Sequence, residues 1–112
     1  MKRRRLIVVR SAALDIQRRN RWWKRNRKEV PVMFAEAVRA GYAALEENAG
    51  IGSPFETAEV DGVHRYQFRA TQHWLYYVVR DIPTLPSHVV VLGIEGPGEA
   101  GPPNLVKAAR EI

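Results

Sequence analysis

The spacing of apolar residues changes near residue 55, and this change limits the folds that the chain can adopt. Between residues 11 and 47, apolar residues recur every three or four positions, as in helices that bury one face. After residue 55, short runs alternate apolar and polar residues or are rich in Val, Tyr and Phe, as in strands. The pattern predicts an α+β domain in which two helices precede most of the strands.

The first half of the chain is expected to contain one strand and two helices. The apolar, β-branched run at residues 5–10 predicts a strand, and Ser11 can cap the helix that follows. Pro31 disfavours helical geometry at the residue before it and suits the first turn of a second helix, expected over residues 31–47. Gly41 lies within that helix, and we expect it to allow close approach to the first helix. The two helices should pack as a hairpin on one face of the sheet.

The second half is expected to form a small antiparallel sheet. Three strands are predicted at residues 63–70, 74–80 and 88–94, with an additional strand at residues 56–60. Asp61-Gly62 favours a tight turn between the first two of these segments, because Gly tolerates positive φ. Residues 95–112 are rich in Gly and Pro and are expected to form an irregular tail. We therefore expect a single domain over residues 1–112 with the order β-α-α-β-β-β.

Positive charge is concentrated at the start of the chain. The protein carries 18 Lys and Arg against 12 Asp and Glu, a formal charge of +6. Residues 1–28 hold twelve of these bases and one acid, so the rest of the chain is net negative. Such an asymmetry attracts an acidic protein segment or a nucleic acid, although a solvated helix face would have the same composition. The basic run also contains two tryptophans, and its candidate binding residues are Arg18, Arg21, Trp22 and Arg25.

A second candidate binding surface is predicted on the sheet. Strand alternation puts two arginines on one face, a histidine in the next turn, and two aromatic residues on the following strand. Arginine is suited to phosphate or carboxylate, and exposed aromatic rings stack on bases or anchor a peptide. The alternative is that an aromatic ring packs under the helices while the arginines form ion pairs with acids of the 56–60 segment. The candidate binding residues of this surface are Arg65, Arg69, His73, Trp74 and Tyr76.

The composition disfavours several other classes of protein. The absence of Cys removes disulfide scaffolds, cysteine zinc sites and thiol nucleophiles. His64, His73 and His88 lie on separate expected elements without carboxylates at ligand spacing, so we expect no metal site and no cofactor. The apolar runs are too short to span a bilayer, and the basic start lacks the apolar length and cleavage site of a signal peptide. We expect a cytoplasmic protein with no membrane partner.

Several short motifs follow one another in a definite order. They are the opening strand leading into SAALDI, the segment ALEENAGIG before a proline, then VHRYQF, HWLYYVV and VVVLGI, and a Gly/Pro tail ending in Asn104-Leu105. In this order and spacing the chain resembles the RelE/ParE superfamily, the toxins of bacterial type II toxin-antitoxin modules, over residues 5–105. The resemblance implies a helical hairpin packed on a small antiparallel sheet. It also implies a cognate antitoxin that docks on the basic protein through an acidic segment.

Two activities divide that superfamily. RelE-type toxins cleave messenger RNA on the ribosome with dispersed basic residues, including an arginine where this chain has Trp74 and an arginine and tyrosine near the C terminus. After Ile94 this chain has no base before Lys107 and no tyrosine. His73 and Tyr77, in HWLYYVV, are more similar to the ParE branch, which is associated with inhibition of DNA gyrase. The resemblance therefore implies a ParE-like toxin. A ribosome-dependent mRNA endonuclease is the alternative, a non-enzymatic nucleic-acid-binding module is the third reading, and no catalytic residue is assigned.

Overall fold

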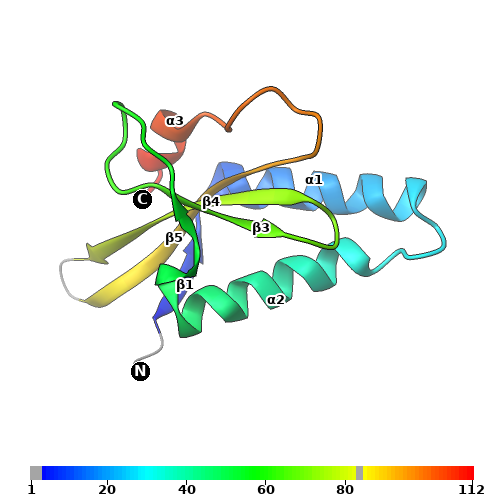
Figure 1. Cartoon of the computed structure of the whole chain (residues 1–112), viewed down its shortest axis with the longest axis horizontal. Helices are drawn as coiled ribbons and strands as arrows, with labels where there is room; N and C mark the ends of the chain where they lie inside the picture. The colour runs from blue at the N-terminus through cyan, green and yellow to red at the C-terminus, as the bar shows by residue number, and fades with distance from the viewer. Residues whose placement is uncertain (1–3, 83–84) are drawn as a thin grey trace.

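The computed structural model describes residues 4–82 and 85–112, which form helices and one sheet (Figure 1). The helical elements are α1 (Arg10–Asn26), α2 (Met33–Glu47), the 3-10 turn η1 (Ala49–Ile51) and α3 (Leu105–Ala109). The strands are β1 (Arg5–Val8), β2 (Ser53–Pro54), β3 (His64–Phe68), β4 (His73–Ile82) and β5 (Leu85–Glu95). The expected α+β class is confirmed. Among the described residues, no helix combines the length and the apolar character needed to cross a membrane.

In the described part of the chain, the sheet has five strands in the order β1-β5-β4-β3-β2. The strands from β2 to β5 pair antiparallel with their neighbours, as expected. β1 pairs with β5 in parallel, so the expectation of a purely antiparallel sheet is wrong. The apolar pattern does not fix the direction of β1, because two helices and three strands separate it from its partner. No hairpin turn therefore imposes the antiparallel direction.

The two long helices cover one face of the sheet. Phe68 and His73 are paired on this face, and the ring of His73 lies 5.0 Å from that of Phe34 on α2. Gly41 on α2 also faces the sheet, because a Cβ there would lie 2.3 Å from Cε1 of Phe68. The expected close approach of Gly41 to α1 is therefore wrong, and the glycine allows α2 to approach β3. The helices diverge from the loop that joins them (Figure 1), and they meet near that loop, where the ring of Trp23 stacks on Phe34 with centroids 6.2 Å apart.

Loops and the short helix α3 cover the opposite face. Tyr76 of β4 lies beside Gly93 of β5 on this face. Gly93 allows Pro103, in the segment leading to α3, to pack directly on the strand, because a Cβ at Gly93 would lie 2.4 Å from Cγ of Pro103. Phe55, in the loop after β2, lies edge-on to the ring of Tyr76 with centroids 5.1 Å apart. The sheet is therefore buried on both faces, but by different kinds of structure.

The loop between β2 and β3 replaces the strand expected at residues 56–60. These residues have no regular structure, and β3 pairs instead with Ser53–Pro54. Val60 and Val63 reach the core from within the loop, so the apolar residues here do not mark a strand face. A turn forms at Asp61-Gly62 as predicted, with a φ of 73° at Gly62, but it leads from the loop into β3 and does not join two strands.

The first long helix starts one residue earlier than expected. α1 begins at Arg10 with Val9 in the N-cap position, so Ser11 is not its cap. Ser11 instead donates hydrogen bonds from its backbone N and Oγ to the carboxylate of Glu111, at 2.7 and 2.5 Å. A partner from the other end of the chain therefore takes the place of a local cap.

The C-terminal segment is not wholly irregular, contrary to the expectation for residues 95–112. Asn104 caps α3, because its Oδ1 accepts a hydrogen bond from the backbone N of Lys107 at 3.0 Å. Leu105 and Ala108 are buried, so the short helix is held by packing as well as by its cap. The last of the Gly and Pro residues is Pro103. The helix after it was missed because the composition was assessed over residues 95–112 as a whole.

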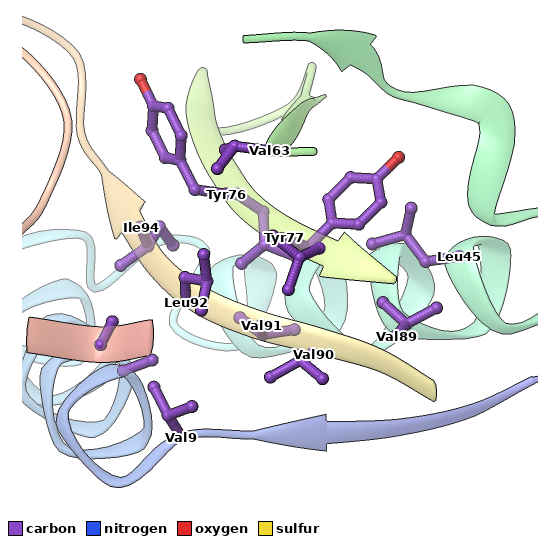
Figure 2. Close-up of a cluster of buried hydrophobic side chains, with 14 of the residues drawn as sticks. Val9, Leu45, Val63, Tyr76, Tyr77, Val89, Val90, Val91, Leu92 and Ile94 are labelled. Carbon is purple, nitrogen blue, oxygen red and sulfur yellow. The ribbon is translucent and has the colours of Figure 1, made fainter. Parts of the chain in front are cut away.

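The core lies between the sheet and its coverings, and Figure 2 shows part of it. β5 lies between β1 and β4, so residues 89–92 are buried on both faces and form a continuous apolar run. Tyr77 on β4 is directed towards Leu45 of α2 in Figure 2. Its hydroxyl donates a hydrogen bond to O of Ala49 at 2.8 Å and accepts one from N of Gly52 at 3.0 Å. These bonds fix the chain after α2 against the sheet.

Candidate functional site

Only some of the residues predicted to form a binding surface on the sheet lie together in the structure. Arg65 and Trp74 lie on the face opposite the long helices, and the guanidinium carbon of Arg65 is 4.2 Å from the Trp74 ring centroid. It also lies 5.4 Å from the ring centroid of Phe55. Tyr76 shares this face but is 1% exposed, and its hydroxyl donates to Oε1 of Glu95 at 2.7 Å. Burial raises the pKa of Tyr76, with Glu95 acting in the same direction and Arg65 against it.

Arg69 and His73 do not join this surface. β3 ends at Phe68, so Arg69 lies in the exposed turn before β4, and the prediction that it shares a strand face with Arg65 is wrong. Four residues of extended chain would in any case separate the two arginines by about 13 Å. His73 is 7% exposed and faces α2.

The alternative prediction, that an aromatic ring packs under the helices and the arginines pair with acids of the 56–60 segment, is also wrong. Trp74 and Tyr76 lie on the face away from α1 and α2, so neither ring packs under the helices. Within residues 4–82 and 85–112, neither Arg65 nor Arg69 forms an ion pair with an acid of the 56–60 segment. The stacking of Arg65 on Trp74 takes the place of the expected ion pair.

A groove of about 870 Å³ lies beside α1. It is bordered by residues 15–27 on and just after α1, by the turn before β4 together with His73, and by residues 96–99 after β5. These segments lie on the side of the molecule away from both termini (Figure 1). Three of the four predicted basic-helix residues, Arg18, Trp22 and Arg25, line this groove, and Arg21 does not. The other charged and aromatic residues of the lining are Asp15, Arg19, Trp23, Arg27, His73 and Glu99.

Arg19 connects two walls of the groove. Its Nε donates to Oδ2 of Asp15 at 3.1 Å, and its Nη2 donates to Oε1 of Glu99 at 2.6 Å. Oε2 of Glu99 also accepts a hydrogen bond from the backbone N of Gly96 at 2.8 Å. Arg19 lowers the pKa of Glu99. Burial would lower the pKa of Arg19, but its bonds to Glu99 and Asp15 outweigh burial and raise it.

Two tryptophans form the aromatic part of the groove. Trp23 is buried, and its Nε1 donates to O of Val30 at 2.9 Å. Trp22 is 46% exposed. The guanidinium carbon of Arg27 lies 5.5 Å from the Trp22 centroid and 5.9 Å from that of Trp23, within cation–π distance of both rings. Arg27 therefore helps to hold the exposed indole at the edge of the groove.

His73 contributes a neutral imidazole to the groove. Its Nδ1 lies 3.1 Å from O of Thr71. Because a carbonyl oxygen only accepts, Nδ1 carries the proton and Nε2 keeps its lone pair. Burial lowers the pKa of His73, and the charge of Arg19 lowers it further. The imidazole is therefore expected to be uncharged at neutral pH.

The groove contains residues that the sequence did not single out. Arg27 belongs to the basic run but was not distinguished from its neighbours, because nothing in the sequence shows that it stacks on both tryptophans. Glu99 lies in the Gly/Pro-rich segment and carries no local signal of its contact with Arg19. Within the described residues, no three His, Cys, Asp or Glu side chains are placed to hold a metal ion.

Comparison with known proteins yields no match to a family model, to a curated protein or to a solved structure. The case for any function therefore depends on the sequence motifs and on the two surfaces described above. One is the stacked Arg65 and Trp74 on the sheet, and the other is the arginine-rich groove beside α1.

Proposed function

We propose that this chain is the cytoplasmic toxin of a bacterial type II toxin-antitoxin module, of the ParE-like kind, and is neutralised by a cognate antitoxin. It binds a protein target, DNA gyrase, and inhibition requires no chemical step. The main support is the concentration of arginine on one helix beside a preformed groove. An acidic segment of a partner would meet these charges together, and such a field speeds association.

The separation of Arg65 from His73 favours binding over cleavage at the sheet surface. Cleavage of RNA through its 2′-hydroxyl needs a base close to a group that stabilises charge on the phosphate. Arg65 stacks on Trp74 on one face of the sheet, whereas His73 faces α2 on the other. These two side chains cannot act on the same phosphate, and a toxin that acts by binding does not need such a pair.

Growth inhibition and gyrase inhibition test the proposal together. Induced expression of the chain should stop growth, and the purified protein should inhibit supercoiling by gyrase. Arg25→Ala should weaken both effects, while Arg21→Ala, a matched change on the same helix outside the groove, should leave them nearly unchanged. Coexpression with the product of the adjacent gene should restore growth, and the two proteins should copurify at moderate salt. Growth arrest with unimpaired gyrase would contradict the target, and no growth arrest would contradict the toxin.

The groove itself favours one second candidate, a RelE-like endonuclease that cleaves mRNA on the ribosome. The observation is that His73, whose pKa is lowered by burial and by the charge of Arg19, lines the same groove as Arg18 and Arg25, which brings a base and phosphate-binding groups to one place. Primer extension on a message from a translation extract would then show cuts that depend on added toxin. Intact messages in that extract, together with inhibited gyrase, would exclude this candidate.

A further inference from the structure

The groove beside α1 presents an aromatic surface that the fold does not use. Trp23 is buried against Phe34, but Trp22, one residue before it, is 46% exposed and lines the groove. Arg27 lies over the Trp22 ring, which leaves the indole oriented but not enclosed. An exposed indole at a groove edge can stack on a planar ligand, and nucleic-acid bases are such ligands.

Arginines outnumber acidic residues in the lining of the groove. Four arginines and two acids line it, and both acids are already engaged. Asp15 accepts from Arg18 and Arg19, and Glu99 accepts from Arg19. Arg25 has no ion-pair partner within the described residues. The groove is therefore suited to an anion that can supply more than one negative group.

The size of the groove limits the form of that anion. Its volume of about 870 Å³ is within the range of sites that hold small organic ligands, roughly 300 to 1,000 Å³. A base can reach Trp22 only when it is unstacked, which a single strand allows and a duplex does not. An acidic peptide would satisfy the arginines, whereas a nucleic-acid strand supplies flat bases and phosphates in regular alternation.

We propose that this groove binds single-stranded nucleic acid. A base stacks on Trp22, and the adjacent phosphates contact Arg25 and Arg18. This proposal concerns the same groove that the proposed toxin function assigns to an acidic partner, but oligonucleotide binding is measured on the isolated chain, so its outcome does not depend on whether the target of the toxin is gyrase.

Fluorescence anisotropy with labelled 12-nucleotide oligo(dT) and oligo(U) tests the proposal on the full chain, at salt concentrations from 50 to 200 mM. Trp22→Leu should weaken binding at least about fivefold, the lower end of the cost of losing a stacking residue, and Trp22→Phe should restore most of it. Arg25→Ala should reduce the slope of log affinity against log salt by about 0.7, the value for one phosphate contact on a single strand. Comparing the two oligonucleotides shows whether DNA or RNA is preferred.

Arg21→Ala is the matched control, because it removes the same charge from the same helix outside the groove. It should leave the salt slope within error of the parent. Trp22, Arg25 and Arg21 are all exposed, so the variants should fold, and thermal melts check this. Each of three results would overturn the proposal: equal binding of Trp22→Leu and the parent, equal loss in Arg21→Ala and Arg25→Ala, or tighter binding of polyglutamate or of a duplex than of either single strand.

Discussion

Replacing Gly41 by Ala should destabilise the protein, although the same change in an exposed helix is stabilising by up to about 1 kcal/mol. The new methyl group would lie 2.3 Å from Cε1, 3.0 Å from Cζ and 3.1 Å from Cδ1 of Phe68. Phe68 is 4% exposed, so its ring cannot move into solvent to make room. Overpacking of this kind costs about 1–3 kcal/mol, which exceeds the gain in helix propensity. We expect a net loss in the free energy of unfolding of about 1 kcal/mol.

Urea unfolding followed by circular dichroism measures that loss as a lower midpoint at an unchanged slope. Two further variants separate the clash from helix propensity. In a Phe68→Leu background the ring is absent, so Gly41→Ala should be neutral or stabilising, and the double-mutant cycle gives the coupling. Ala43→Gly, at an exposed position of the same helix, measures the propensity term alone. A Gly41→Ala protein more stable than the parent would refute the reasoning.

Two other predictions concern stability. Arg19 lowers the pKa of Glu99 in the folded protein. Ionised Glu99 therefore stabilises the fold above pH 4.5, its ordinary pKa, and this contribution to the free energy of unfolding is lost as the pH falls through the lower pKa of the folded state. The parent should therefore melt at a higher temperature than Glu99→Gln at pH 7, and the two melting temperatures should converge as the pH falls below 4.5; a constant difference would count against this pair. Tyr77→Phe removes the hydroxyl that bonds Ala49 and Gly52, and should cost about 1–3 kcal/mol in a urea titration because buried backbone groups lose their partner. A change below about 0.5 kcal/mol would mean that water replaces the hydroxyl.

The sequence predicted the elements of this fold better than their partners. Apolar spacing located both long helices and the strands from β3 to β5, and Asp61-Gly62 located a turn. Apolar spacing could not predict the parallel pairing of β1 with β5, because the two strands are far apart in the sequence and no turn residue indicates how they pair. Gly41 shows the same limit. Its place within a helix implied a close contact, but the partner was a strand rather than the other helix.

The candidate sites depend even more on contacts between distant segments. The sequence identified Arg18, Trp22 and Arg25 from the basic run, because charge and aromatic content are local properties. It placed Arg69 on a strand that ends one residue earlier, which is within the usual uncertainty of element ends. Glu99 completes the groove through a bond across 80 positions, and no local pattern could indicate it.

The groove beside α1 forms late in synthesis, because the bond between Arg19 and Glu99 joins residues 80 positions apart. The arginine lies in the first helix, and its partner is translated 80 residues later, which takes about 4 to 16 s at 5 to 20 residues per second. Throughout that interval the nascent chain carries the cationic helix without the third wall of the groove. The groove is complete only after the chain beyond β5 has emerged, so a translation product that ends before residue 96 would keep the cationic helix and lack one wall of the groove.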